Sequence, residues 1–274
     1  MPKIDLKTIV ANKVPKVARY IPNCVINWLR KVLHEDQVNE ILDRYWDLPP
    51  QAFIHGFFDY MKISYAIEGL EKIDPTRRYI FVSNHPFGGM DGLMLADKLM
   101  DHFGDVRVVV NDLLMNVEPL RPLWIPVNKH GAQSASYARQ FDEAFAGDVP
   151  ILTFPSGLCS RCKNGIVSDL AWKTNFLKRA AATGREVVPI FVEGHLSRFF
   201  YRLANLRERL GIKFNIEMLF LSDEMFQQQG QHFRIRVGEP ISIAQLQKEG
   251  SLPEQAEYVR KKTYLLKKEL HKEA

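Results

Sequence analysis

The stretch Ile80-Phe-Val-Ser-Asn-His-Pro-Phe-Gly-Gly-Met-Asp-Gly92 passes from an apolar run through a glycine pair into a helical pattern. The run Ile-Phe-Val predicts a buried strand that ends at Ser83, and the letters DGLMLADKLM from Asp91 predict a helix. Similar patterns alternate along the chain, with strands expected at 79–83, 106–110, 124–127, 150–154, 187–192, 215–220 and 233–237. Helices are expected at 91–102, 134–146, 167–183, 199–211 and 253–271. This alternation predicts an α/β fold, with a layered, mostly parallel sheet flanked by helices.

The chain before the first of these strands has a different character, both helical and basic. Residues 23–67 predict two or three helices, broken at Leu48-Pro-Pro50. We therefore expect a helical, basic N-terminal element over 1–67 and an α/β domain over 68–274. The two are expected to form one unit and not two independent domains.

The net charge of +5 is a property of the N-terminal element. Residues 1–31 hold seven basic residues against Asp5, which gives +6, so the rest of the chain sums to −1. The basic residues are Lys3, Lys7, Lys13, Lys16, Arg19, Arg30 and Lys31. With Ile26, Trp28 and Leu29 at helical spacing, this charge predicts docking on an anionic membrane surface. The alternative is that the apolar residues pack on the α/β domain. Basicity confined to one end does not predict nucleic-acid binding.

Composition and motifs exclude several other classes of protein. With 274 residues, 46% hydrophobic and 25% charged, the chain is ordinary for a globular protein. Its three cysteines cannot form a disulfide framework and fit a reducing compartment; Cys159 and Cys162 form a lone C-x-x-C that does not predict zinc. We expect no signal peptide and no membrane-spanning helix. The usual nucleotide-phosphate loops are absent from the sequence, and no metal or cofactor is expected.

His85 and Asp91 lie on one short loop, with two glycines between them. An imidazole can take a proton from an attacking group while a carboxylate fixes its tautomer and stabilises the imidazolium. The pair therefore predicts general base catalysis. The alternative is that Asp91 only caps the helix and that His85 is a turn residue.

Four blocks of the sequence resemble, in the same order, those of the glycerolipid acyltransferases, the lysophosphatidic-acid acyltransferase superfamily. The blocks are Asn84-His85 with Asp91, Leu123-Trp-Ile-Pro-Val-Asn-Lys129, Phe154-Pro-Ser-Gly157 with Arg161, and Val187-Val-Pro-Ile-Phe-Val192. Their counterparts are the family's Asn-His…Asp block, its apolar strand ending in a basic residue, its Phe-Pro-Glu-Gly-Thr-Arg-Ser block and its Val-Pro block. The first block most resembles a bacterial branch, often labelled hemolysin-like, that includes O-acyltransferases of amino-acid-containing lipids.

The resemblance implies transfer of a fatty acyl group from an acyl thioester, on coenzyme A or acyl-carrier protein, to a hydroxyl of a lysolipid in membrane lipid synthesis. It also implies that the acceptor attacks the thioester directly, with His85 as base and Asp91 as its orienting partner. Backbone amides near Gly88 and Gly89 are candidates for part of an oxyanion site. The expected location is peripheral, on the cytoplasmic face of the inner membrane. A non-catalytic lipid-binding protein on the same scaffold is the alternative.

Two departures from the family pattern concern the acceptor. Five residues separate His85 from Asp91 instead of four, and the glycine pair is able to loop out the extra residue. Ser156 replaces the family's glutamate, and its arginine is displaced to Arg161. An acceptor with a head group other than that of lysophosphatidic acid is therefore competitive, and Lys129 and Arg161 are candidates to bind it as carboxylate or phosphate. The substrate-binding candidates are Asn84, Gly88, Gly89, Lys129, Ser156, Gly157 and Arg161.

Overall fold

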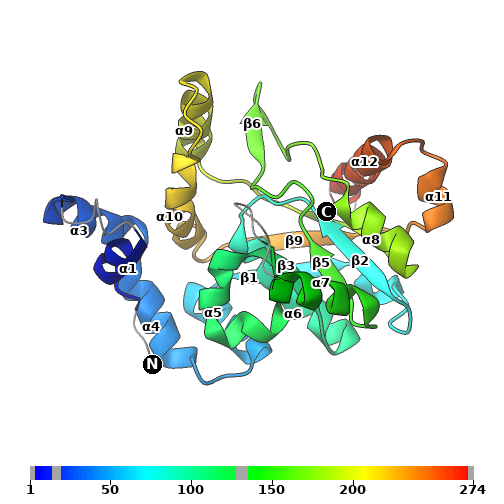
Figure 1. The fold of residues 1–274 in the computed structure, drawn as a ribbon, viewed down its shortest axis with the longest axis horizontal. Helices are drawn as coiled ribbons and strands as arrows, with labels where there is room; N and C mark the ends of the chain where they lie inside the picture. Colours follow the sequence, from blue (N-terminus) through cyan, green and yellow to red (C-terminus); the bar gives the residue numbers. More distant parts are fainter. Residues whose placement is uncertain (1–3, 14–19, 128–134, 271–274) are drawn as a thin grey trace.

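The computed structural model describes residues 4–13, 20–127 and 135–270 of the chain. Its centre is a seven-stranded sheet with the order β1-β9-β8-β2-β5-β3-β4 (Figure 1). The strands of this sheet are β1 (Ser64–Glu68), β2 (Tyr79–Ser83), β3 (Arg107–Asn111), β4 (Trp124–Val127), β5 (Ile151–Thr153), β8 (Glu186–Val192) and β9 (His232–Val237). Every neighbouring pair is parallel except β8 and β9. This confirms the expected α/β class with a mostly parallel sheet.

Helices flank the sheet, and β2 shows why both faces need cover. All five residues of β2 are buried. Tyr79 and Phe81 face a core shared with α5 and α6, whereas Ile80 and Val82 face a second core shared with α8 and α12. The helices are α1 (Leu6–Lys13), α3 (Asn23–Val32), α4 (Glu35–Tyr45), α5 (Pro50–Met61), α6 (Gly89–Phe103), α7 (Ala135–Ala146), α8 (Asn175–Thr183), α9 (Arg198–Arg209), α10 (Leu221–Phe226), α11 (Ile243–Gln247) and α12 (Leu252–Leu270). Shorter 3-10 turns are η1 (Leu70–Lys72), η2 (Asp112–Asn116), η3 (Glu118–Leu123) and η4 (Ile216–Phe220).

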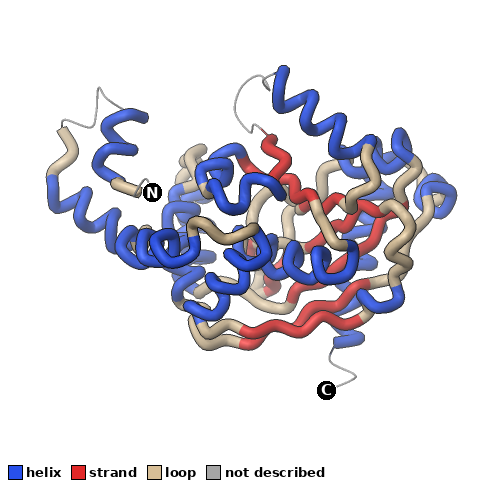
Figure 2. Tube along the Cα trace, turned by 90° about the horizontal axis from the view of Figure 1, so that it is seen from below, coloured by secondary structure: helices blue, strands red, loops and turns tan. Residues whose placement is uncertain are grey.

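The N-terminal helices extend to one side of the body, next to the marked N-terminus in both views (Figures 1 and 2). They are joined to the body through α5, which buries Phe53, Ile54 and Phe57 in the main core. Within the described residues, no helix is long and apolar enough to cross a membrane. The division expected between 67 and 68 falls inside β1, so the helical part of the chain ends before the sheet begins.

Three expected elements differ from those observed. Residues 64–67 were expected to be helical, but α5 ends at Met61, Lys62 follows with a positive φ of 52°, and β1 then pairs with β9. The strand expected at 215–220 is wrong: these residues form η4, whose turn carries Glu217 into the interior against two arginines. The expected helix at 167–183 begins only at Asn175, because 161–168 form a hairpin instead.

That hairpin consists of β6 (Arg161–Lys163) and β7 (Ile166–Ser168), which pair antiparallel. Asn164 and Gly165 form its two-residue turn, with φ of 52° and 79°. An Asn-Gly pair with positive φ at both positions matches the right-handed twist of two strands. The Asn-Gly dipeptide therefore predicts a hairpin turn, but the strands on either side have only three residues and are hard to recognise in the sequence.

Candidate active site

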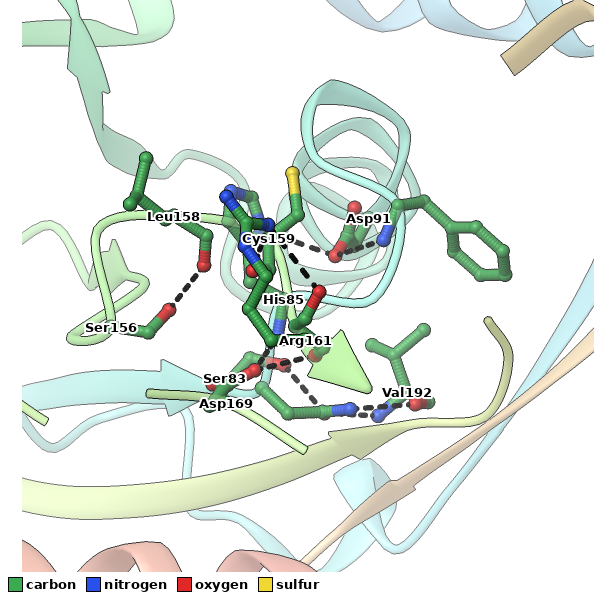
Figure 3. Close-up of polar contacts among 12 residues, drawn as sticks. Ser83, His85, Asp91, Ser156, Leu158, Cys159, Arg161, Asp169 and Val192 are labelled. Atoms are coloured by element: carbon green, nitrogen blue, oxygen red, sulfur yellow. Dashed lines mark hydrogen bonds and ion pairs between the residues drawn. The ribbon is translucent and has the colours of Figure 1, made fainter. Parts of the chain in front are cut away.

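His85 and Asp91 are brought together where β2 gives way to α6 (Figure 3). The Nδ1 atom of His85 lies 3.1 Å from Oδ2 of Asp91, and the backbone N–H of Phe87 donates to the same oxygen at 3.2 Å. Asp91 is in the first turn of α6 and is fully buried. The structure thus confirms the expected contact, and the catalytic role of the two residues remains a prediction.

The surroundings of the pair favour one protonation pattern. Burial raises the pKa of Asp91, and the neighbouring His85 opposes this shift. A hydrogen on Nδ1 of His85 would donate to the carboxylate, leaving the lone pair of Nε2 facing outward. None of the described residues bonds Nε2, and the side chain is 18% exposed. The ring also stacks on Phe154 at a centroid distance of 4.1 Å, which fixes its plane.

The two glycines of the loop have different roles. Gly88 precedes α6 with φ of 81° and ψ of −116°, a conformation that strongly favours glycine. A Cβ at this position would also lie 3.2 Å from Sγ of Cys159. Gly89 has no positive φ, and a Cβ there would meet nothing within 4 Å. Gly88 therefore accommodates the extra residue of the His-to-Asp spacing, while the space beside Gly89 is open.

Asn84 was expected among the substrate-binding residues, but its side chain is occupied by the protein. Its Nδ2 donates to the carbonyl of Val192 at 2.9 Å, and its Oδ1 accepts from the N–H of Val192 at 2.7 Å. These bonds tie the end of β2 to the end of β8. The asparagine thereby positions the adjacent His85.

Asp169, which the sequence did not single out, holds the His85 loop from the other side. Its Oδ1 accepts from the backbone N–H of His85 at 3.2 Å and from Oγ of Ser160 at 2.6 Å, while Oδ2 accepts from Trp172 at 2.9 Å. The N–H of Ser160 in turn donates to the carbonyl of His85 at 2.8 Å. The segment after β5 is thus fastened to the loop that carries the candidate base (Figure 3).

The Phe-Pro-Ser-Gly block forms a turn within this segment. Oγ of the buried Ser156 donates to the carbonyl of Leu158 at 2.8 Å, so the hydroxyl is engaged within the turn. Gly157 has a φ of 67°, and a Cβ there would lie 3.2 Å from Nζ of Lys173. Lys173 is exposed, and among the described residues no carboxylate pairs with its ammonium. No sequence motif marks this cation, because it lies 16 residues after Gly157 in a segment expected to be helical.

Arg161 was expected to bind an acceptor head group, but its guanidinium is paired within the protein. The side chain is buried and donates to Oε1 of Glu217 at 3.0 Å and to the carbonyl of Cys159 at 2.8 Å. Arg207 binds the second oxygen of the same carboxylate at 2.9 Å. Arg161 is therefore not a solvated surface charge and is not a free cation. The other expected head-group residue, Lys129, lies outside the described residues.

Among the described residues, no group of three histidine, cysteine, aspartate or glutamate side chains is arranged to hold a metal ion.

Comparison with known proteins places this site in a family. The sequence model described as "Acyltransferase" matches residues 8–273. A lyso-glycine lipid O-acyltransferase of Bacteroides thetaiotaomicron is 39% identical over 264 residues, covering 96% of this chain and 97% of that protein. A protein of the same name from Phocaeicola vulgatus is 40% identical and covers 96% and 95%. The crystal structure of a 1-acyl-sn-glycerophosphate acyltransferase from Thermotoga maritima is more distant, with a TM-score of 0.49 and 18% identity over 89% of this chain and 95% of that one. The chain belongs to the glycerolipid acyltransferase superfamily and is an acyltransferase.

Proposed function

We propose that this enzyme transfers a fatty acyl group from an acyl thioester to a hydroxyl of a lysolipid with an amino-acid head group, of the lyso-glycine lipid type. The observation that carries the proposal is the contact of His85 with the buried Asp91, with Nε2 of the histidine left open. Its support for this acceptor is the identity of 39–40% over 96% of the chain to two lyso-glycine lipid O-acyltransferases. The intact dyad disfavours a non-catalytic lipid-binding protein.

The proposed reaction is a single displacement at the thioester carbonyl. Nε2 of His85 removes the proton of the acceptor hydroxyl as its oxygen attacks the carbonyl carbon, and Asp91 stabilises the imidazolium that forms. The tetrahedral intermediate then expels the thiolate, which takes the proton back from His85. The C–O bond of an ester forms, the C–S bond breaks, and a free thiol leaves. The donor is acyl-CoA or acyl-carrier protein, and no further cofactor takes part.

The developing oxyanion requires hydrogen-bond donors that are fixed in advance. The N–H groups in the first turn of a helix have no partner within the helix. Among the described residues, no atom beyond the chain neighbours and helix backbone of Gly89 lies within 4 Å of a Cβ built there. We therefore assign the thioester carbonyl to this side of the loop. Gly88 contributes by holding the turn, since a side chain there would strain the backbone and press on Cys159.

The acceptor's head group is assigned to the side of the Phe-Pro-Ser-Gly turn. Arg161 is buried and paired with Glu217, and Ser156 replaces the glutamate of the family pattern. Lys173, near Gly157, is a cation that pairs with no carboxylate of the described residues, and it can pair with an acidic head group such as a carboxylate. Lys129 is a second candidate from the sequence.

A lipid acceptor also requires contact with a bilayer. We infer peripheral binding to the cytoplasmic face of the inner membrane through the basic N-terminal element. In α3, Ile26 is buried while Val25 and Trp28 remain exposed, so only part of its apolar surface packs on the protein. The exposed part, with Arg30 and Lys31, suits an anionic membrane surface.

The test is release of free thiol from an acyl thioester in the presence of a panel of lysolipids. The proposal expects release that depends on the acceptor and is greatest for a lyso-glycine lipid, with its O-acylated form as product by mass spectrometry. Lysophosphatidic acid is the matched acceptor with a phosphate head group. Preference for that acceptor would overturn the head-group assignment, and thiol release that needs no acceptor would overturn the direct transfer.

A further inference from the structure

The solvent face of α9 is unusually apolar. A helix packed on a protein ordinarily shows polar residues to water and apolar residues to the core. Here Phe200, Tyr201 and Ala204 fill the buried face. The exposed face still presents large apolar residues, and so does the segment that follows it: Phe199, Leu206, Leu210, Ile212 and Phe214, of which Phe199 is 53% and Phe214 66% exposed.

The β6–β7 hairpin stands beside α9 and extends this surface (Figure 1). Asn205 of α9 donates to the carbonyl of Cys162 at 3.1 Å, which fixes the two elements side by side. Ile166, next to the hairpin turn, is exposed. The hairpin begins at Arg161, directly after the Ser160 that bonds His85, so the surface starts next to the dyad.

An aromatic chain joins the same surface to the N-terminal element. Phe199 contacts Phe220 with ring centroids 5.0 Å apart, and Phe220 contacts Trp28 of α3 at 6.0 Å. Trp28 is itself exposed. The apolar side chains of α3 and α9 are therefore linked through Phe220, and the hairpin lies beside α9.

Basic residues are interleaved with these apolar ones. Arg198, Arg202, Arg209 and Lys213 are all exposed, and the acidic residue among them, Glu208, is paired with Lys163 of the hairpin at 3.6 Å. Exposed cations between aromatic and aliphatic side chains match a bilayer that has an apolar interior and anionic head groups. An apolar patch alone would fit many partners, whereas this charge selects an acidic lipid surface.

We propose that α9, residues 210–214 and the tip of the β6–β7 hairpin form a second bilayer-contact surface, here called the α9 surface. It is distinct from the basic N-terminal element and is joined to it through Trp28 and Phe220. Bound on both sides of the site, the enzyme would meet the bilayer with its dyad close to the lipid. This deepens the proposed function and rests on it, since a lysolipid acceptor enters from the membrane.

The experiment uses the full-length enzyme and vesicles of phosphatidylcholine, alone or with one third phosphatidylglycerol. The apolar variant combines Phe199→Ser, Leu210→Ser and Phe214→Ser, all at exposed positions. Its partition onto the mixed vesicles, followed by sedimentation, is expected to fall about tenfold or more. The matched control, Leu265→Ser on α12, removes a side chain that is 48% exposed and should leave partition unchanged.

A charge variant keeps the proposal testable if the apolar variant fails to fold. Arg202→Gln, Arg209→Gln and Lys213→Gln should weaken binding to the mixed vesicles and flatten its decline with salt, with little effect on neutral vesicles. The control neutralises three exposed lysines of α12, namely Lys261, Lys267 and Lys268. Unchanged binding in both α9 variants, or an equal loss in the controls, would overturn the α9 surface.

Two further measurements distinguish an error in the α9 surface from an error in the proposed function. With a short-chain thioester and an acceptor below its micelle concentration, the α9 variants should release thiol at the wild-type rate, because the dyad is intact. Absence of thiol release from the wild type would contradict the proposed function, whatever the vesicles show. A wild-type dimer that the apolar variant dissociates, with no vesicle binding, would instead assign the surface to a second copy of the chain.

Discussion

The loop that contains His85 and the segment that contains Arg161 match two motifs of the family, but the charged side chains of the two motifs have different surroundings. His85 meets Asp91, six residues away, and keeps one ring nitrogen open. Arg161 meets Glu217, 56 residues away, and is held in the interior by this carboxylate, which it shares with Arg207. The first pairing depends on a strand end and a helix start that are local in sequence. The pairing of Arg161 depends on a tertiary contact that no motif in its own segment predicts.

This difference shows when a sequence motif predicts the geometry of a site. When the interacting residues of a motif lie on one loop and in the first turn of the next helix, the local sequence predicts their geometry. This is so for the dyad, which is placed by Gly88 and α6. A lone basic residue in a motif says only that a charge is present. Whether that charge faces a ligand or a buried carboxylate is decided by distant residues.

The largest effect is expected at the dyad itself. His85→Ala removes the general base, and kcat should fall by roughly 10²–10⁴-fold while the fold is retained. Thiol release from the acyl thioester measures the change. The matched control is His55→Ala, which removes another histidine–aspartate contact, to Asp97 at 2.6 Å, away from the site. A comparable loss in both variants would mean that stability, and not proton transfer, is responsible.

The next effect concerns stability. Arg161→Met removes one of the two arginines that bind the buried Glu217, and a hydrogen bond to a charged group contributes about 1.5–3 kcal/mol. Urea unfolding should show this loss, with the acceptor KM unchanged in the folded fraction. Lys163→Met is the control, because its ion pair with Glu208 is exposed and contributes at most about 1 kcal/mol. A raised acceptor KM without loss of stability would return Arg161 to the head-group site.

The sequence predicted most of the fold for reasons that are visible in particular elements. The run at 79–83 is fully buried, and such continuous apolar runs are typical of parallel strands covered on both faces. The strand expected at 215–220 does not form, because the apolar residues there surround Glu217. Pairing of this carboxylate with two arginines outweighs the preference of the apolar residues for a strand. β1 was missed because its partner β9 lies more than 160 residues later.

The candidate site was predictable to the same extent. His85, Asp91 and Gly88 were found because they share one loop. Asp169 and Lys173 were missed because their relation to that loop exists only after β5 and the hairpin are folded beside it. Asn84 was found but given another role, since its bonding to Val192 depends on the neighbouring strand β8.

A smaller effect tests the glycine pair. Gly88→Ala places a side chain at φ of 81° and close to Cys159, so the free energy of unfolding should fall by about 1–3 kcal/mol. Gly89→Ala is the matched control and should keep its stability to within about 0.5 kcal/mol, because its space is open. If Gly89→Ala nevertheless lowers kcat/KM, the reacting carbonyl lies beside it. Equal stability of the two variants would contradict the role assigned to Gly88.

The smallest effect is expected at the free cation, Lys173, and it separates the two kinds of charge most directly. Lys173→Met should raise the KM of an acidic acceptor about two- to fivefold, as an exposed ion pair contributes up to about 1 kcal/mol. The donor KM and the unfolding curve should not change, because Lys173 is exposed and forms no ion pair with the described residues. Lys178→Met, on the exposed part of α8, is the control. An acceptor whose acidic group is converted to an amide should bind the wild type and Lys173→Met alike. If the KM of this amide acceptor still differs between the two proteins, Lys173 acts through the conformation of the turn and not through its charge. Lys173 and Arg161 would then differ only in their position.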